Sequence, residues 1–213
     1  MNRTIVDLEA GLDMKARITA AAIRLFGAHG YEGASLQAIA DAVGIRKQSL
    51  LHHFPSKETL HRHVVESLVV YWKNELPRLL AATESGYGRF DATMTALVQF
   101  FLEDPDRARL TVREMLDRPA MLAAMMREHL SPWARLIADY IRMGQDSGLI
   151  RADIRPESYL IQVMLMIIAT AGLGPVASVL VHGDHEESRP DVAELVRIAH
   201  DSLFKKPRSV RAQ

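Results

Sequence analysis

Residues 35–54 read SLQAIADAVGIRKQSLLHHF and form the most informative segment of the sequence. It predicts two short helices separated by a turn at Gly44. A helix-turn-helix needs a small residue where its helices cross, a turn residue that tolerates positive φ, and an apolar residue that returns the second helix to the core. Ala40, Gly44 and Leu50 fill these three roles. The segment therefore predicts a helix-turn-helix.

The second of these helices, expected over about residues 46–53, turns Leu50 and Phe54 inward and polar or basic side chains outward. The outward residues are Arg46, Lys47, Gln48, Ser49, His52 and His53. Such a face suits phosphates and base edges in a major groove. Any helical hairpin also has a turn glycine and a polar outer face, so the pattern alone leaves a purely structural hairpin open.

Helical periodicity covers nearly all of the 213 residues, and no run is typical of a strand. A first helix is expected over residues 13–29, with Gly30 as its stop, and Ser56 caps a long helix that runs towards Ala82. Later helices are expected over about 89–103, from 105, from 119 with an interruption near 131–132, from 156 and from 190. The fold class is therefore predicted to be all-α.

Composition narrows the class of protein further. Hydrophobic residues make up 48% of the chain and charged residues 24%, which is typical of a folded protein. The formal net charge is zero, with a small positive excess in residues 1–63, and the absence of cysteine excludes disulfides. Residues 158–181 carry no charge and could span a bilayer, but Gly172, Gly174 and Pro175 interrupt the run and no basic anchor flanks it. We expect a buried interface helix there and no membrane.

Residues 17–60, RITAAAIRLFGAHGYEGASLQAIADAVGIRKQSLLHHFPSKETL, resemble the N-terminal domain of the TetR family of bacterial transcriptional regulators. Residues 144–153 also resemble the family's link into its dimerisation helices. The matching positions of the first segment are Leu25-Phe26, Gly30-Tyr31, Ser35, Ile39-Ala40, Ala42-Val43-Gly44, Lys47, Leu50, Phe54 and Ser56-Lys57-Glu58. The resemblance implies a regulator that binds double-stranded DNA.

The resemblance also implies roles for residues that contact the DNA backbone. Ser35 and Gln37 open the first helix of the motif, where the family contacts phosphate and sometimes a base. Lys47 and Lys57 match the family's phosphate-contacting lysines, and Lys57 also lies at a helix N-terminus, which favours an anion. These four residues are expected to position the protein on DNA.

The resemblance implies that the residues that contact bases, and so recognise the operator sequence, are Arg46, Gln48 and Ser49. Two departures from the family pattern affect this face. Leu51 stands where the family usually has a tyrosine that touches the DNA backbone, so that contact is expected to be missing. Arg46 replaces the common Ser or Thr at the start of the recognition helix, which removes a cap but adds a positive charge.

The resemblance divides the chain into a disordered arm (1–12), a helix-turn-helix domain (13–56), a helical regulatory and dimerisation domain (57–204) and a basic disordered tail (205–213). It implies a cytoplasmic homodimer, formed through residues 156–204, on a palindromic operator. No cofactor is expected.

In the family the helical domain also holds a small-molecule inducer. Met and aromatic residues line adaptable cavities, although at helical spacing they more often form plain core. Few charges fall among the candidates, which favours a small apolar or aromatic ligand that releases a repressor from DNA. The alternative is a helix-turn-helix regulator controlled by a protein partner without a small inducer. The candidate pocket residues are Phe101, Met115, Met121, Met125, Trp133, Tyr140 and Met164.

The sequence offers neither a metal site nor catalytic machinery. His52 and His53 point in different directions on their helix, and His61 and His63 are expected to be polar residues of the linking helix. A nucleophile with a nearby base, a metal cluster and a phosphate-cradling glycine loop are all absent from the sequence pattern. We therefore expect no enzyme.

Overall fold

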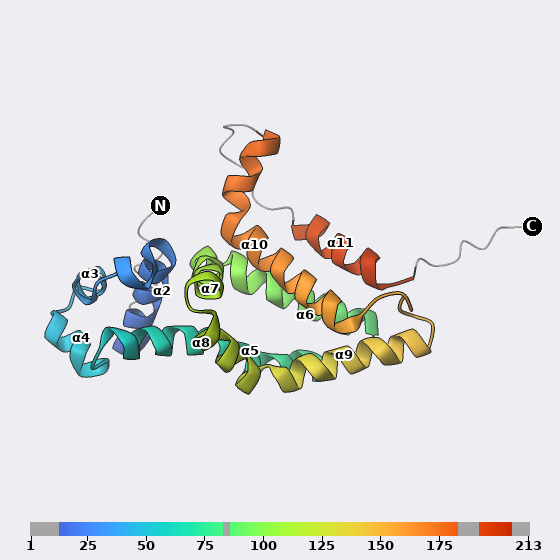
Figure 1. Cartoon of the computed structure of the whole chain (residues 1–213), viewed down its shortest axis with the longest axis horizontal. Helices are drawn as coiled ribbons and strands as arrows, with labels where there is room; N and C mark the ends of the chain where they lie inside the picture. The colour runs from blue at the N-terminus through green and yellow to red at the C-terminus, as the bar shows by residue number, and fades with distance from the viewer. Residues whose placement is uncertain (1–12, 83–85, 183–191, 206–213) are drawn as a thin grey trace, which may run out of the picture.

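The computed structural model describes residues 13–82, 86–182 and 192–205. These residues form an all-α fold, as predicted, with one isolated backbone bridge between Ile150 and Phe204 (Figure 1). The predicted arm and all but the first residue of the predicted tail lie outside the described residues. In chain order the helices are α2 (Met14–Gly33), α3 (Leu36–Ala42), α4 (Lys47–His53), α5 (Lys57–Ala82), α6 (Gly86–Leu102), α7 (Pro105–Asp117), α8 (Pro119–His129), α9 (Ser131–Asp146), α10 (Pro156–His182) and α11 (Val192–Leu203).

Helices α2, α3 and α4 gather at one end of the molecule around a core of their own (Figure 1). Phe26, Ile39 and Leu50 are wholly buried in it, because each lies on the apolar face of its helix. Leu60 of α5 and Leu110 of α7 complete the same cluster. The helix-turn-helix end therefore packs against α5 and α7 of the larger helical region.

Helix α2 does not end where the sequence predicts. Gly30 adopts a φ of 71°, which breaks the regular helix as predicted, but a further turn continues to Gly33. Glycine reaches this conformation without the steric cost that a Cβ atom brings. The result is a kink at Gly30 rather than a stop.

A second and larger core lies between α5, α6, α9, α10 and α11. Its apolar side chains include Trp72, Phe101 and Ile167, which come from three different helices. Ser56 caps α5 as predicted, since its Oγ accepts a hydrogen bond from the Thr59 N–H at 3.0 Å. The predicted interruption near residues 131–132 is the boundary between α8 and α9.

Helix α7 lies close to both parts because glycines face it on each side. A Cβ atom on Gly27 of α2 would lie 3.0 Å from the Asp106 carbonyl oxygen, and one on Gly172 of α10 would lie 3.4 Å from Ala108. Small residues let helix backbones approach closely, so α7 bridges the helix-turn-helix and α10. A movement of α7 therefore reaches both.

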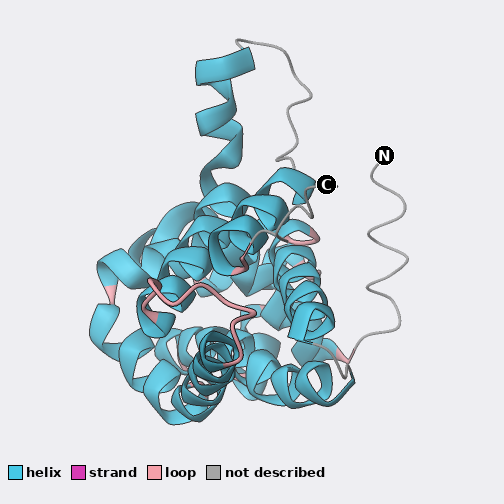
Figure 2. Cartoon of the chain, turned by 90° about the vertical axis from the view of Figure 1, so that its right-hand side faces the viewer, coloured by secondary structure: helices cyan, strands magenta, loops and turns pink. Residues whose placement is uncertain are grey.

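Among the described helices, one is long and apolar enough to cross a membrane by length and composition: α10, over residues 156–173. Ile167, Ile168 and Ala171 of that segment are buried against the larger core, as expected of a core helix. Beyond this core the last turns of α10 stand clear of the other described helices (Figure 2).

Candidate nucleic-acid interface and core cavity

The turn between α3 and α4 fixes the direction of the recognition helix. Gly44 has a φ of 74°, the conformation that the sequence predicts for a turn glycine. Its N–H donates to the Asp41 carbonyl at 3.1 Å, and the Ile45 N–H donates to the Ala40 carbonyl at 3.0 Å. This pair of bonds is a Schellman motif, which satisfies the last carbonyls of α3. Ala40 and Leu50 are wholly buried, in the places that the motif requires.

Helix α4 presents the polar face that the sequence predicts. Arg46 occupies the N-cap position and makes no side-chain capping bond, as its replacement of Ser or Thr implies. Leu51, at the position of the family's tyrosine, is half-buried. The exposed residues of this face are Arg46, Lys47, Gln48, Ser49, His52 and His53.

Ser35 and Gln37 lie at the start of α3 with donors still available. The Ser35 Oγ accepts a hydrogen bond from the Ala38 N–H at 3.0 Å and keeps its own hydrogen for another partner. The Gln37 amide donates to the Asp41 carboxylate at 2.7 Å, which fixes its orientation and leaves one N–H unused by that bond. Both side chains can therefore still donate to a phosphate.

Lys57, the first residue of α5, is tethered to the end of α2. Its Nζ donates to the Glu32 carbonyl at 3.4 Å and lies 4.5 Å from the centroid of the Tyr31 ring. An ammonium has three donors, so this arrangement leaves capacity for an anion at the N-terminus of α5.

A buried polar chain joins α5 to α7 and α8, and it corrects one expectation. His61 is wholly buried rather than a polar residue of the linking helix's surface. Its Nε2 lies 2.8 Å from Glu114 Oε1, and its Nδ1 lies 3.1 Å from Arg118 Nη1. A guanidinium can only donate, so Nδ1 accepts and Nε2 carries the hydrogen that it donates to Glu114. His61 is therefore the neutral Nε2–H tautomer in this arrangement.

The chain continues from Arg118 to the first turn of α5. Arg118 Nη2 donates to Glu58 at 3.1 Å, and its guanidinium lies 4.3 Å from the Tyr31 ring centroid. Burial raises the pKa of the Glu58 carboxyl, but hydrogen bonds from Arg118 and Tyr31 outweigh this and hold the pKa below its usual value. The Arg118 bond links the junction of α7 and α8 to the helix that directly follows the motif.

Arg113 of α7 supports the kink of α2. Its Nε donates to the Gly27 carbonyl at 2.7 Å, and its Nη2 donates to the Ala28 carbonyl at 2.9 Å. These carbonyls precede Gly30, where the helical bonding pattern breaks, so the arginine supplies partners for them. The planar guanidinium thus fixes α7 against the helix-turn-helix end.

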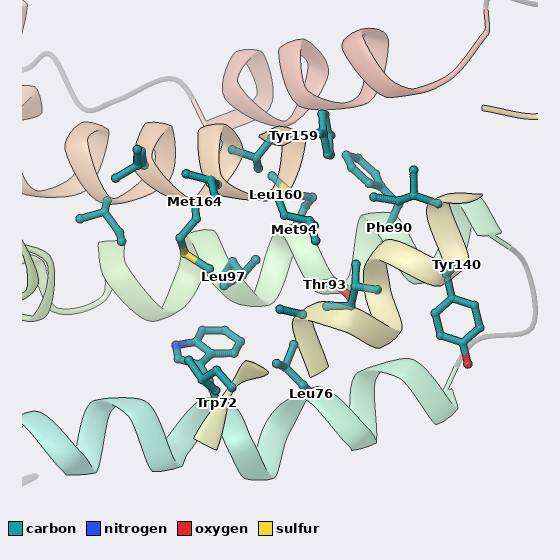
Figure 3. Close-up of a pocket in the computed structure, with 18 of the residues that line it drawn as sticks. Trp72, Leu76, Phe90, Thr93, Met94, Leu97, Tyr140, Tyr159, Leu160 and Met164 are labelled. Carbon is teal, nitrogen blue, oxygen red and sulfur yellow. The ribbon is translucent and has the colours of Figure 1, made fainter. Parts of the chain in front are cut away.

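The larger core borders a partly open cavity of about 650 Å³, within the range of small-molecule sites. Figure 3 shows it between α5, α6, α9 and α10, with Trp72 and Leu76 rising from α5 and Met94 and Leu97 facing them from α6. Its lining is overwhelmingly apolar. Val65 and Leu80 of α5 both line it, and they lie about 22 Å apart along a regular helix. The cavity is therefore elongated.

Four of the seven predicted pocket residues line this cavity: Phe101, Met115, Tyr140 and Met164. Met121 and Met125 lie outside the lining and pack against a small cluster of Val65, Val69 and Leu122. Trp133 also lies outside it and packs against the larger core. The structure therefore places these three residues outside the cavity lining, whereas Met126, one position after Met125 on α8, lines it.

The sequence analysis did not predict several of the residues that line the cavity. They include Trp72 of α5 and Glu114 of α7. A carboxylate four residues after buried Leu110 on the same helix face was the available signal for Glu114.

Within the described residues no group of three or more His, Asp or Glu side chains is placed to hold a metal ion.

Large apolar side chains of α10 and α11 are exposed in the single chain, and we call this surface the α10–α11 face. Its residues are Ile161, Leu165, Leu173, Val176 and Ile198.

The sequence matches two family models. Residues 18–64 match the one described as "Bacterial regulatory proteins, tetR family". Residues 89–196, just over half of the chain, match the one described as "Tetracyclin repressor-like, C-terminal domain". The matched families are regulatory proteins rather than enzymes.

Relatives of known function share part of their length with the chain. The negative transcriptional regulator of the biofilm operon icaADBC, IcaR, from Staphylococcus epidermidis is 30% identical over 117 residues, 55% of this chain and 61% of that protein. IcaR from Staphylococcus aureus strain Newman is 34% identical over 94 residues, 44% of this chain and 49% of that protein. The chain thus spans about half to three-fifths of the length of these relatives.

Solved structures share the fold at low sequence identity. The ketosteroid transcriptional regulator KstR2 of Mycobacterium tuberculosis matches with a TM-score of 0.69 at 17% identity, over 91% of this chain and 96% of that one. The fatty acid degradation regulator FadR from Bacillus halodurans matches with a TM-score of 0.65 at 16% identity, over 93% and 97%.

Proposed function

The chain belongs to the TetR family of bacterial regulatory proteins, and on that premise we propose that it is a cytoplasmic repressor that binds a palindromic operator as a homodimer. The observation that carries the proposal is the exposed polar face of α4, held outward by the Gly44 turn and by buried Leu50. A basic and amide face on a helix of this motif fits the major groove. The negative regulators that resemble this chain support repression rather than activation.

The homodimer is supported by the α10–α11 face. Ile161 is 60% exposed and Val176 is 75% exposed, on a helix whose last turns project from the single chain (Figure 2). Large apolar side chains left exposed in this way are typical of an interface. Two copies related by a two-fold axis would cover it and would present two α4 helices to DNA.

The cavity supports release of the repressor by a small apolar or aromatic ligand. A ligand shifts the equilibrium between DNA-binding and released states only as far as it prefers one of them. Helices α5 and α7 both line the cavity and contact the helix-turn-helix end, so they offer a route for such a preference. Control by a protein partner, without a small inducer, is the second candidate function.

DNA binding is tested by retaining genomic fragments on the purified chain. The wild type is compared with a triple variant in which Arg46, Lys47 and Gln48 are all replaced by alanine. These side chains are exposed, so the variant should keep its fold and lose the retained fragments. Retention of the same fragments by both proteins would refute the role of α4.

A further inference from the structure

Two of the residues that line the cavity each carry a buried polar atom without a hydrogen-bond partner. The two atoms are Oε2 of Glu114 and Nε1 of Trp72. Glu114 is 3% exposed and Trp72 is 6% exposed, so bulk water does not satisfy them. Buried polar groups in proteins are nearly always paired, and an unpaired one in a cavity wall indicates a place where a ligand atom binds.

The two oxygens of Glu114 differ in what they contact. Oε1 takes the hydrogen bond from His61, which the Arg118 guanidinium holds as the neutral tautomer. Oε2 has no partner, and within the described residues no lysine or arginine forms an ion pair with this carboxyl. A donor brought by a ligand would therefore fill an open position rather than displace an existing bond.

We propose that the cavity binds an elongated apolar molecule whose one polar end, a hydroxyl or a protonated amine, donates a hydrogen bond to Oε2 of Glu114. The elongated apolar lining accounts for the body of the molecule, and the Trp72 N–H offers a donor to an acceptor atom on it. A carboxylate is disfavoured at Glu114, because it would bring an acceptor and a negative charge against that residue, whereas Arg89 lines the cavity beside Tyr140. This inference rests on the proposed function and specifies the ligand class of its cavity.

The position of Glu114 also gives the ligand a route to the DNA-binding end. The carboxyl that receives the ligand is the first member of the chain that runs through His61 and Arg118 to Glu58, in the first turn of α5. A donor on Oε2 draws charge from the carboxyl and weakens the His61 bond on Oε1. The ligand therefore acts on the contacts that fix α5 beside the motif.

The first test uses the full-length wild type and three probes of the same chain length, below their aggregation limits. Decylamine and 1-decanol carry a donor, whereas methyl decyl ether carries only an acceptor. We expect calorimetric titration to show one site per chain, with at least one donor probe binding about tenfold or more tightly than the ether. Tighter decylamine identifies the ammonium as the donor, and tighter decanol identifies the hydroxyl. Equal affinities for all three probes would overturn the proposal.

The second test replaces the acceptor without changing its shape. In Glu114→Gln the amide oxygen can still accept from His61, so the amide nitrogen faces the cavity as a donor. The preference for the donor probe should fall about tenfold or invert in favour of the ether. Glu103→Gln, an exposed carboxyl at the end of α6, is the matched control and should keep the wild-type preference.

An unchanged preference in folded Glu114→Gln would overturn the assignment of Glu114. Should that variant not fold, the wild-type comparison of the three probes still decides the proposal. Neither titration contains DNA. Failure of the ligand inference therefore leaves operator binding intact, and failure of operator binding leaves the probe preference intact.

Discussion

The Nε2 atom of His61 and the Oε1 atom of Glu114 lie 2.8 Å apart, at a buried contact between α5 and α7. The two residues are 53 positions apart in the chain, and one of them lines the ligand-sized cavity while the other lies one turn into the helix that follows the motif. This polar contact thus connects the cavity wall to the helix beside the DNA-binding motif, between the two sites that we propose for ligand and DNA. Its contribution to the stability of the protein can be measured directly.

Replacing His61 by phenylalanine should destabilise the protein by about 1–3 kcal/mol, because Glu114 and Arg118 each lose a buried partner. Phenylalanine has a similar ring, so the loss would not come from an empty space. Urea unfolding measures the difference. His63→Phe, at a half-buried position beside Phe54, is the control and should change the free energy of unfolding by less than about 1 kcal/mol. Equal effects of the two substitutions would contradict a specific role for His61.

Replacing Gly44 by alanine should cost about 1–2 kcal/mol, because the turn requires a φ of 74°. No atom lies within 4 Å of the position that a Cβ atom would take, so the cost comes from the backbone alone. Asparagine tolerates the left-handed region better, and Gly44→Asn should therefore be more stable than Gly44→Ala. Thermal unfolding compares the variants, and an alanine variant as stable as the wild type would refute this account of the turn.

Residues that contact phosphates and residues that contact bases should differ in how their replacement changes the salt dependence of DNA binding. Lys47→Ala and Lys57→Ala should weaken binding to all DNA sequences alike and flatten the salt dependence, by about one unit of slope per lost phosphate contact. Arg46→Ala or Gln48→Ala should instead relax preference at particular base pairs, at a cost of about 1–3 kcal/mol. Site selection at several salt concentrations distinguishes these classes. Identical selected sequences for wild type and Arg46→Ala would show that Arg46 reads no base.

A charge on the α10–α11 face should separate the subunits. Ile161→Glu should raise the dimer dissociation constant by more than about a hundredfold, because it buries an unpaired carboxylate at the interface. Leu116→Glu, which alters an exposed apolar residue of α7, is the control and should leave the dimer intact. Sedimentation velocity measures both. A wild type that sediments as a monomer at micromolar concentration would contradict the interface itself.

The motif was predictable because its determinants are local. Ser35 and Gly44 act through hydrogen bonds within a few residues of their own positions. The same holds for the break between α8 and α9. The spacing of Leu50 marks it as an inward residue in the sequence, although it packs against residues as remote as Leu110. Local signals of this kind fix helix ends and the outward face of a short helix.

The cavity was only partly predictable because helical spacing does not tell which neighbour a face meets. Met115, Met121 and Met125 all pack against the cluster of Val65, Val69 and Leu122, yet of these three only Met115 also lines the cavity. His61 was misplaced for a related reason, since its partner Glu114 is remote in the chain. Helical spacing can mark a polar side chain on a buried face, but it does not identify a partner 53 positions away.

Footprinting of the full-length chain on its retained fragments shows whether two copies of α4 bind one operator. We expect two protected segments with inverted sequences, on one face of the DNA, whose centres lie about 34–36 Å apart. Protection of a single segment without an inverted repeat, or of no defined segment, would contradict this expectation.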